Sequence, residues 1–299
     1  MEVKAAPPGN WPYRAAGRRL RAAGHDWWLV DCGPHDAPVI LLLHGLGASG
    51  HSFRRTIAGL SVAFRVVVPD LPGQGFSRAG HRGRLGLAPM AEDLATLCQV
   101  ADIAPVAIVG HSAGAALALQ MARHMPLRGV VGLNAALGSF EGAEGLLFPV
   151  LAQGLAALPF TAPMIARLWG TARTVDRLLQ GTGSALDPET RALYLTLVRN
   201  PAHVAGALGM MAQWRLSDLM ASLPGLQTPV LLIATTGDRA VPARISREAA
   251  ALLPQATFVE LAGGHLAHEE AADGLSRLMI DWLAPRLQRA DRDGASKIA

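Results

Sequence analysis

Short runs of apolar residues alternate along the chain with longer stretches in which apolar positions recur every three or four residues. The short runs predict β-strands and the longer stretches predict α-helices. In central runs such as 39–43 and 106–109 every residue is apolar, which is typical of parallel strands covered on both faces. The predicted strands are 18–23, 27–32, 39–43, 65–69, 106–109, 129–134, 229–235 and 257–261. The predicted helices include 53–60, 87–103, 243–253 and about 268–288. This alternation predicts an α/β protein with a mostly parallel, eight-stranded sheet and helices on both faces.

The alternation stops between residues 137 and 217, where the pattern is helical and is interrupted by proline and glycine. A helical insertion after the sixth strand is expected to lie over the carboxyl ends of the strands, where ligands bind in open α/β sheets. We therefore expect residues 1–136 and 218–289 to form the sheet-containing core and residues 137–217 to form a helical lid. The charged residues 290–299 are expected to be a disordered tail.

One part of the expected lid, residues 146–170, is markedly apolar and approaches the length of a transmembrane span. Prolines at positions 149, 159 and 163 interrupt it. They favour short helices that line a hydrophobic pocket over a continuous span. Contact with a membrane surface is the alternative.

The composition indicates a folded protein, because 51% of the residues are hydrophobic and only 17% are charged. The net charge is +4, and its densest cluster, four arginines between residues 14 and 21, accompanies no nucleic-acid-binding motif. A nucleic-acid partner is therefore not expected. Cys32 and Cys98 form neither a disulfide framework nor a metal pattern, and the first residues contain no apolar secretory signal. These features predict a cytoplasmic protein, with peripheral membrane contact as an alternative.

The candidate chemistry begins at Gly-His-Ser-Ala-Gly, residues 110–114. A predicted strand precedes this sequence and an Ala/Leu-rich helix follows it, which is the context of a nucleophile elbow. In such a turn Ser112 is held in a strained conformation at a helix N-terminus, and glycine on either side avoids collisions. The alternative is a glycine-rich loop that contains a serine by chance.

A serine nucleophile needs a general base and an acid that orients this base. In the elbow context, the acid and then the base follow the serine in the chain, each after a later strand. Asp238 and His265 satisfy both conditions, although singly they are also typical of a turn and a loop. The backbone N–H groups of Ala113 and Leu46 are the candidate oxyanion donors. A structural glycine turn is the alternative for the Leu46 loop.

Substrate contacts are expected beside the serine and in the helical insertion. The candidates are His111, Phe148, Trp169, Met210, Met211 and Trp214. His265 and the following His268-Glu269 match no zinc motif, and no glycine-rich phosphate loop leads from a strand into a helix. We therefore expect no metal and no cofactor, and we expect His268 and Glu269 to brace the final helix.

Five ordered motifs together resemble the α/β-hydrolase superfamily. They are HGLGAS (44–49), DLPGQGFS (70–77), GHSAG (110–114), GDRAVP (237–242) and GGHLAHE (263–269). Position by position, the resemblance implies that Ser112 is the nucleophile, His265 the base, Asp238 its partner, and Leu46 and Ala113 the oxyanion donors. Serine at the elbow, in place of aspartate, points away from haloalkane dehalogenases and epoxide hydrolases.

The chain also resembles the magnesium chelatase accessory proteins of bacteriochlorophyll biosynthesis, the BchO family. This resemblance rests on WPYR (11–14), LLLHGLGASGHSF (41–53), GHSAGAA (110–116), LNAALGSFEG (133–142) and HVAGALGMMAQW (203–214). It implies assistance to the insertion of magnesium into protoporphyrin IX.

We therefore expect a serine hydrolase that is functionally linked to magnesium chelatase. Its substrate would carry an ester or related acyl group and be small and hydrophobic, either tetrapyrrole-related or lipid-like. A non-catalytic role in binding porphyrin or assisting the chelatase is one alternative. A generic carboxylesterase is the other.

Overall fold

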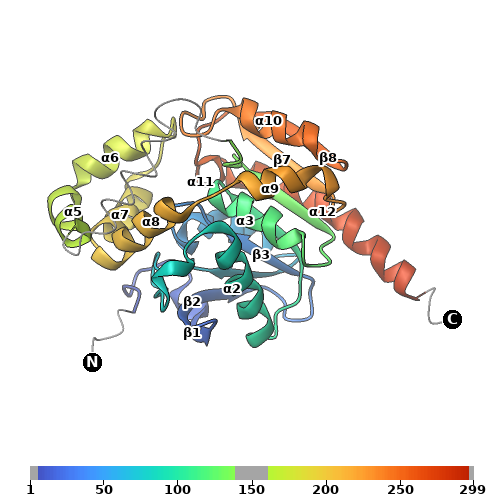
Figure 1. Cartoon of the computed structure of the whole chain (residues 1–299), viewed down its shortest axis with the longest axis horizontal. Helices are drawn as coiled ribbons and strands as arrows, with labels where there is room; N and C mark the ends of the chain where they lie inside the picture. The colour runs from blue at the N-terminus through green and yellow to red at the C-terminus, as the bar shows by residue number, and fades with distance from the viewer. Residues whose placement is uncertain (1–5, 139–160, 296–299) are drawn as a thin grey trace.

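An eight-stranded sheet forms the centre of the computed structural model, which describes residues 6–138 and 161–295 (Figure 1). The strands are β1 (Gly17–Ala22), β2 (His25–Cys32), β3 (Val39–Leu43), β4 (Arg65–Pro69), β5 (Pro105–His111), β6 (Gly129–Leu133), β7 (Val230–Thr235) and β8 (Ala256–Leu261). Their order in the sheet is β1-β2-β4-β3-β5-β6-β7-β8. β2 is antiparallel to β1 and β4, and all other neighbours are parallel. The predicted sheet is confirmed.

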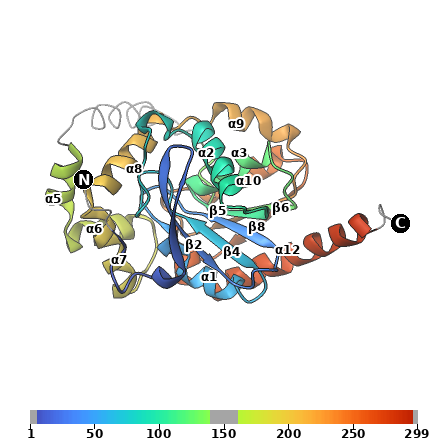
Figure 2. The same cartoon turned by 90° about the horizontal axis from the view of Figure 1, so that it is seen from below.

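The parallel strands are buried on both faces, as their continuous apolar sequence predicts. In β3, Val39, Leu41 and Leu43 belong to one hydrophobic cluster and Ile40 and Leu42 to the other, because successive side chains point to opposite faces. Each cluster is completed by helices, and Figure 2 shows α2 and α3 on one side of the sheet and α1 and α12 on the other.

The helices have the following bounds. The α-helices are α1 (Arg54–Leu60), α2 (Leu87–Val100), α3 (Ala113–Ala122), α5 (Thr161–Trp169), α6 (Ala172–Gly181), α7 (Pro188–Val198), α8 (Pro201–Gln213), α9 (Ser217–Ser222), α10 (Ala243–Leu252), α11 (Ala267–Glu270) and α12 (Ala272–Ala295). The short 3-10 helices are η1 (Arg14–Ala16), η2 (Gly50–Phe53), η3 (Arg82–Arg84) and η4 (Leu223–Gly225).

Helices α5–α8, which we call the cap helices, lie between β6 and β7 in the chain, and α6, α7 and α8 contact loops at the carboxyl ends of the strands. Val175 and Leu179 of α6 pack in one cluster with Ala48 of the β3 loop. On α8, the Nδ1 atom of His203 accepts a hydrogen bond from the backbone N–H of Gly75, in the β4 loop. The helical content predicted for 161–213 is thus present, while a lid function for 137–217 stays a prediction.

The C-terminal region differs from the expected single helix. The final helix, predicted as continuous over 268–288, is divided into α11 and α12 at Ala271. The carbonyl of Glu269 accepts a hydrogen bond from the Arg55 guanidinium (2.9 Å), so a long-range contact competes with the helix. Residues 290–295, which were expected to belong to a disordered tail, continue α12, and disorder of the tail stays a prediction. Extending a helix that is already formed fixes only one residue for each added hydrogen bond.

The apolar segment 146–170 lies outside the described residues as far as position 160. Within the ranges 6–138 and 161–295, no helix is both long enough and apolar enough to cross a membrane.

Candidate active site

Ser112 lies in a sharp turn between β5 and α3. Its φ of 53° and ψ of −118° form a strained combination for a residue other than glycine. A Cβ atom on Gly110 would lie 2.2 Å from the carbonyl oxygen of Gly114, and a Cβ on Gly114 would lie 2.0 Å from that of Leu43. Only glycine therefore fits on either side of the turn. The predicted strand–turn–helix geometry is present, and it leaves Ser112 partly exposed.

Asp238 follows β7 and His265 follows β8, so both lie at the same edge of the sheet as Ser112. The Nδ1 atom of His265 lies 2.7 Å from Oδ2 of Asp238. The other carboxylate oxygen of Asp238 accepts the N–H groups of Ala240 and Val241, each at 2.8 Å. This arrangement holds the proton of His265 on Nδ1 and leaves Nε2 available to accept a proton.

Three groups from different elements hold the backbone of His265. Its carbonyl oxygen accepts hydrogen bonds from Nδ2 of Asn134 and Nε2 of His111, both at 2.9 Å. Its N–H donates to the carbonyl of Thr182, which follows α6 (3.1 Å). Asn134 also accepts the backbone N–H of Thr235 at 2.9 Å. Asn134 was not singled out from the sequence, although its place directly after β6 is a signal of this role.

The two predicted oxyanion donors lie in segments that adjoin Ser112. Ala113 is the first residue of α3, so its N–H has no carbonyl four residues earlier in the helix to donate to. Leu46 lies in the loop after β3, and a Cβ on the preceding residue, Gly45, would lie 3.1 Å from Cβ of Ser112. The loop therefore lies against the elbow. Binding of an oxyanion by these N–H groups stays a prediction.

Two of the predicted substrate-contact residues are almost fully buried. His111 is 2% exposed, and its Nε2 is used in holding His265. Met210 is 1% exposed, and its sulfur accepts a hydrogen bond from Nε2 of Gln74 at 3.1 Å. Both side chains are placed to support the site's loops.

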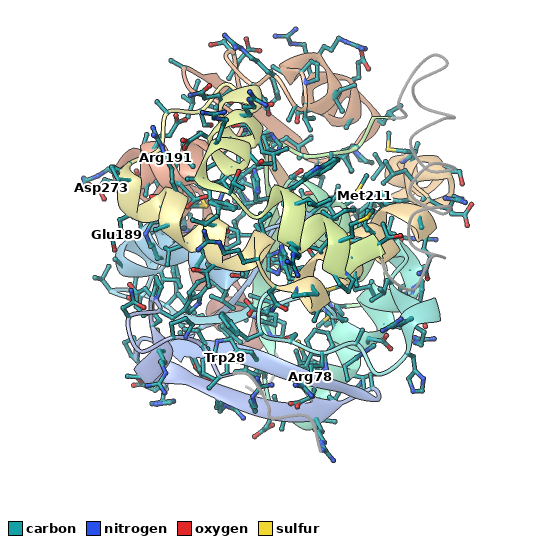
Figure 3. All side chains as sticks on the ribbon, turned by 90° about the vertical axis from the view of Figure 1, so that its left-hand side faces the viewer. Trp28, Arg78, Glu189, Arg191, Met211 and Asp273 are labelled. Atoms are coloured by element: carbon teal, nitrogen blue, oxygen red, sulfur yellow. The ribbon has the colours of Figure 1, made fainter. Side chains whose placement is uncertain are left out.

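The other predicted substrate contacts lie nearer the surface. Met211, labelled in Figure 3, and Trp214 are half-buried at the end of α8. Trp169, at the end of α5, is 59% exposed. Phe148 lies outside the described residues. A substrate contact for these residues stays a prediction.

Buried histidines gather beneath the site. The ring of His111 lies 4.2 Å from that of His268 and 4.6 Å from that of His265, measured between centroids. Burial lowers the pKa of His268 to about 3, and it lowers the pKa of His44 and of His203 to about 4. These rings are therefore neutral at neutral pH. Within the described part of the chain, no group of three potential ligands is arranged to hold a metal ion.

A buried carboxylate connects the cap helices to the core. Glu269 of α11 accepts hydrogen bonds from Arg54 of α1 (2.9 Å) and from the hydroxyl of Tyr194 on α7 (2.7 Å). Burial raises the pKa of this carboxyl to about 7, although both partners oppose the shift. Glu269 thus joins α1 and α7 to α11, where the sequence suggested only a brace for the final helix.

The chain is similar in sequence and fold to known proteins. Residues 38–272 match the sequence profile of the family described as alpha/beta hydrolase fold. The chain belongs to the α/β-hydrolase family. The enol-lactonase from Burkholderia xenovorans LB400 superposes with a TM-score of 0.73 at 24% identity, covering 89% of this chain and 100% of the enzyme. At this identity the likeness supports the fold alone.

Within the α/β-hydrolase family, the chain is 56% identical to the "Magnesium-chelatase 30 kDa subunit" of Rhodobacter capsulatus over 93% of its own length and 98% of that protein. This identity confirms the resemblance to the BchO family. The chain is also 31% identical to the "Pimeloyl-[acyl-carrier protein] methyl ester esterase" of Xanthomonas oryzae pv. oryzae, over 83% of this chain and 95% of the esterase.

Proposed function

We propose that this α/β-hydrolase is a serine hydrolase that cleaves an ester or related acyl bond. His265 takes the proton from the Ser112 hydroxyl as the serine oxygen attacks the carbonyl carbon, and Asp238 stabilises the resulting imidazolium. The N–H groups of Ala113 and Leu46 stabilise the oxyanion. His265 then gives the proton to the leaving group, and water hydrolyses the acyl-enzyme by the same steps.

The observation that carries this proposal is the hydrogen bond of 2.7 Å between His265 and Asp238, on the sheet edge where Ser112 occupies its strained turn. No hydrogen bond to the Ser112 hydroxyl is present within residues 6–138 and 161–295. In structures without substrate such catalytic bonds are commonly long, and they tighten on binding. The esterase relative in Xanthomonas supports the reaction class.

Hydrolysis of p-nitrophenyl esters of increasing acyl length tests the proposal. We expect Ser112→Ala to lower kcat by at least about a thousandfold. The matched control is Ser217→Ala, at an exposed position in α9, which is expected to leave kcat unchanged. A folded Ser112→Ala protein with wild-type kcat would contradict the proposal.

We further propose that the protein assists magnesium chelatase in bacteriochlorophyll biosynthesis, because the relative at 56% identity is named as a subunit of that enzyme. Its substrate would then be a hydrophobic acyl compound, tetrapyrrole-related or lipid-like, held under a lid formed by residues 137–217. The protein would act in the cytoplasm, in part at a membrane surface.

A second candidate function is binding of a porphyrin or support of the chelatase without turnover. It is favoured by the same relative, whose printed name describes a chelatase subunit and no hydrolytic reaction. Complementation of a deletion strain separates the two functions. Failure of Ser112→Ala to restore pigment supports catalysis, and full rescue supports binding alone. A deletion with no effect on pigment would instead indicate a generic carboxylesterase.

A further inference from the structure

Helices α5 and α6 expose a concentration of large apolar side chains. Of the eight large hydrophobic residues that are exposed within the described residues, four lie on these two helices. They are Met164 (53%), Leu168 (62%), Trp169 (59%) and Leu178 (59%). The inner faces of the helices are separately satisfied, since Ala166, Val175 and Leu179 are buried. The exposed side chains are therefore not needed for packing of the cap helices.

Exposed basic side chains lie on the same two helices. Arg167, Arg173 and Arg177 are all exposed, and none of them has an ion-pair partner within residues 6–138 and 161–295. Asp176, the acidic residue in 161–181, lies 3.7 Å from Arg191 of α7. The exposed surface of α5 and α6 is thus both apolar and positively charged. We call these seven exposed residues of α5 and α6 the cap face.

The cap face lies at an extremity of the molecule. In Figure 1, α5 and α6 occupy the end farthest from the C-terminus, and in Figure 3 this end faces the viewer. Residues 164 and 168 are one helical turn apart, as are residues 173 and 177, so each pair projects from one side of its helix. Met164 and Leu168 are therefore presented together on α5, and Arg173 and Arg177 together on α6.

We propose that the cap face binds the surface of an anionic lipid bilayer. Met164, Leu168 and Trp169 enter the headgroup region, where the amphipathic ring of tryptophan is favoured. The three arginines pair with lipid phosphates while their aliphatic stems remain at the apolar boundary. Charge complementarity selects this partner, because the unpaired charge on the face is of one sign. The inference rests on the proposal that the protein acts in part at a membrane surface, and it does not depend on Ser112.

The cap face is connected to the candidate active site. α6 ends at Gly181, and the carbonyl of the next residue, Thr182, accepts the N–H groups of His265 and Arg239. A bilayer bound by α6 would thus lie one connection away from the loops that carry the base and the acid. This position suits a substrate that concentrates in membranes.

Flotation with vesicles tests the charge component. Vesicles of phosphatidylcholine alone are compared with vesicles of phosphatidylcholine and phosphatidylglycerol. An arginine near an anionic surface contributes a factor of about five, so the triple variant R167Q/R173Q/R177Q should lose about a hundredfold in partitioning to the anionic vesicles. The control R18Q/R21Q/R128Q removes the same charge from other exposed positions and should lose less than about threefold. Equal loss in the two variants, or equal binding of the wild type to both vesicles, overturns the proposal.

Two further variants test the apolar component. Leu168→Ser should weaken flotation about tenfold. The control is Val62→Ser, which should leave flotation unchanged, because Val62 is 77% exposed but precedes β4, at the amino ends of the parallel strands. The wild-type tryptophan emission should shift to the blue on vesicle binding, and Trp169→Phe should abolish that shift. Unfolding temperatures confirm that each variant is folded. An unchanged blue shift in Trp169→Phe would place the contact elsewhere and overturn the proposal.

Discussion

Asn134 offers a direct test of how the fold positions the candidate base. It is 3% exposed, and it joins the carbonyl of His265 to the N–H of Thr235 across neighbouring loops. Asn134→Ala leaves the buried N–H of Thr235 without its partner, at about 1–3 kcal/mol. The φ of 45° at this position adds roughly 1–2 kcal/mol for alanine. We expect a loss of about 3 kcal/mol in the free energy of unfolding, measured by urea denaturation.

The kinetic consequence distinguishes positioning from stability. A displacement of His265 by about 1 Å is expected to lower kcat for ester hydrolysis about a hundredfold, with little change in KM. Asn134→Asp keeps the acceptor for Thr235 but removes the donor to His265, so it should lower kcat as well. The control is Asn200→Ala, which removes the N-cap of α8 and costs about 1 kcal/mol. Unchanged kcat in both Asn134 variants, or an equal fall in Asn200→Ala, would refute this reasoning.

The remaining predictions concern the elbow and the buried titratable groups. Gly114→Ala places Cβ 2.0 Å from a backbone oxygen, so it should abolish ester hydrolysis and destabilise the fold by more than about 3 kcal/mol in thermal unfolding. The control is Gly83→Ala, where nothing lies within 4 Å of the added Cβ, and it should change stability by less than about 0.5 kcal/mol. A folded and active Gly114→Ala protein would show that the elbow is not sharp. Acidification below about pH 6.5 should destabilise the protein, because buried histidines protonate when they unfold but remain neutral in the fold. Between pH 8 and pH 5, three of these histidines each lower the free energy of unfolding by about 2 kcal/mol. Two buried carboxyls with raised pKa values increase it by about 4 kcal/mol in total over the same range. The histidines are His44, His203 and His268. The carboxyls are Glu269 and Asp70, whose pKa is raised by burial to about 6. Urea unfolding should show a net loss of about 2 kcal/mol at the lower pH, and a gain there would contradict the assignment of neutral histidines.

Local pattern was enough to predict the sheet. The apolar runs that became β3 and β7 are buried on both sides, and such runs have few other stable positions in an α/β protein. The meeting of Ser112, Asp238 and His265 at one edge of the sheet was likewise predictable. Each residue follows a parallel strand, and parallel strands bring their carboxyl ends to the same edge.

Contacts between distant segments were not predictable in this way. Asn134 follows β6, Thr182 follows α6 and His265 follows β8, so their hydrogen bonds join segments that are far apart in the chain. No local periodicity encodes such contacts. His111 is a second example. Its position next to Ser112 in the sequence suggested a substrate contact, whereas its ring donates a hydrogen bond to the carbonyl of His265 in another loop. Next to the break at Ala271, the carbonyl of Glu269 accepts a hydrogen bond from Arg55, which lies more than two hundred residues earlier in the chain.

Covalent labelling shows whether Ser112 is an activated nucleophile. The protein is treated with a fluorophosphonate probe, and the modified peptide is identified by mass spectrometry. We expect a single adduct on Ser112, formed much more slowly in His265→Gln and absent in Ser112→Ala. A wild-type protein that is folded but unlabelled, or labelled equally in Ser112→Ala, would contradict this expectation.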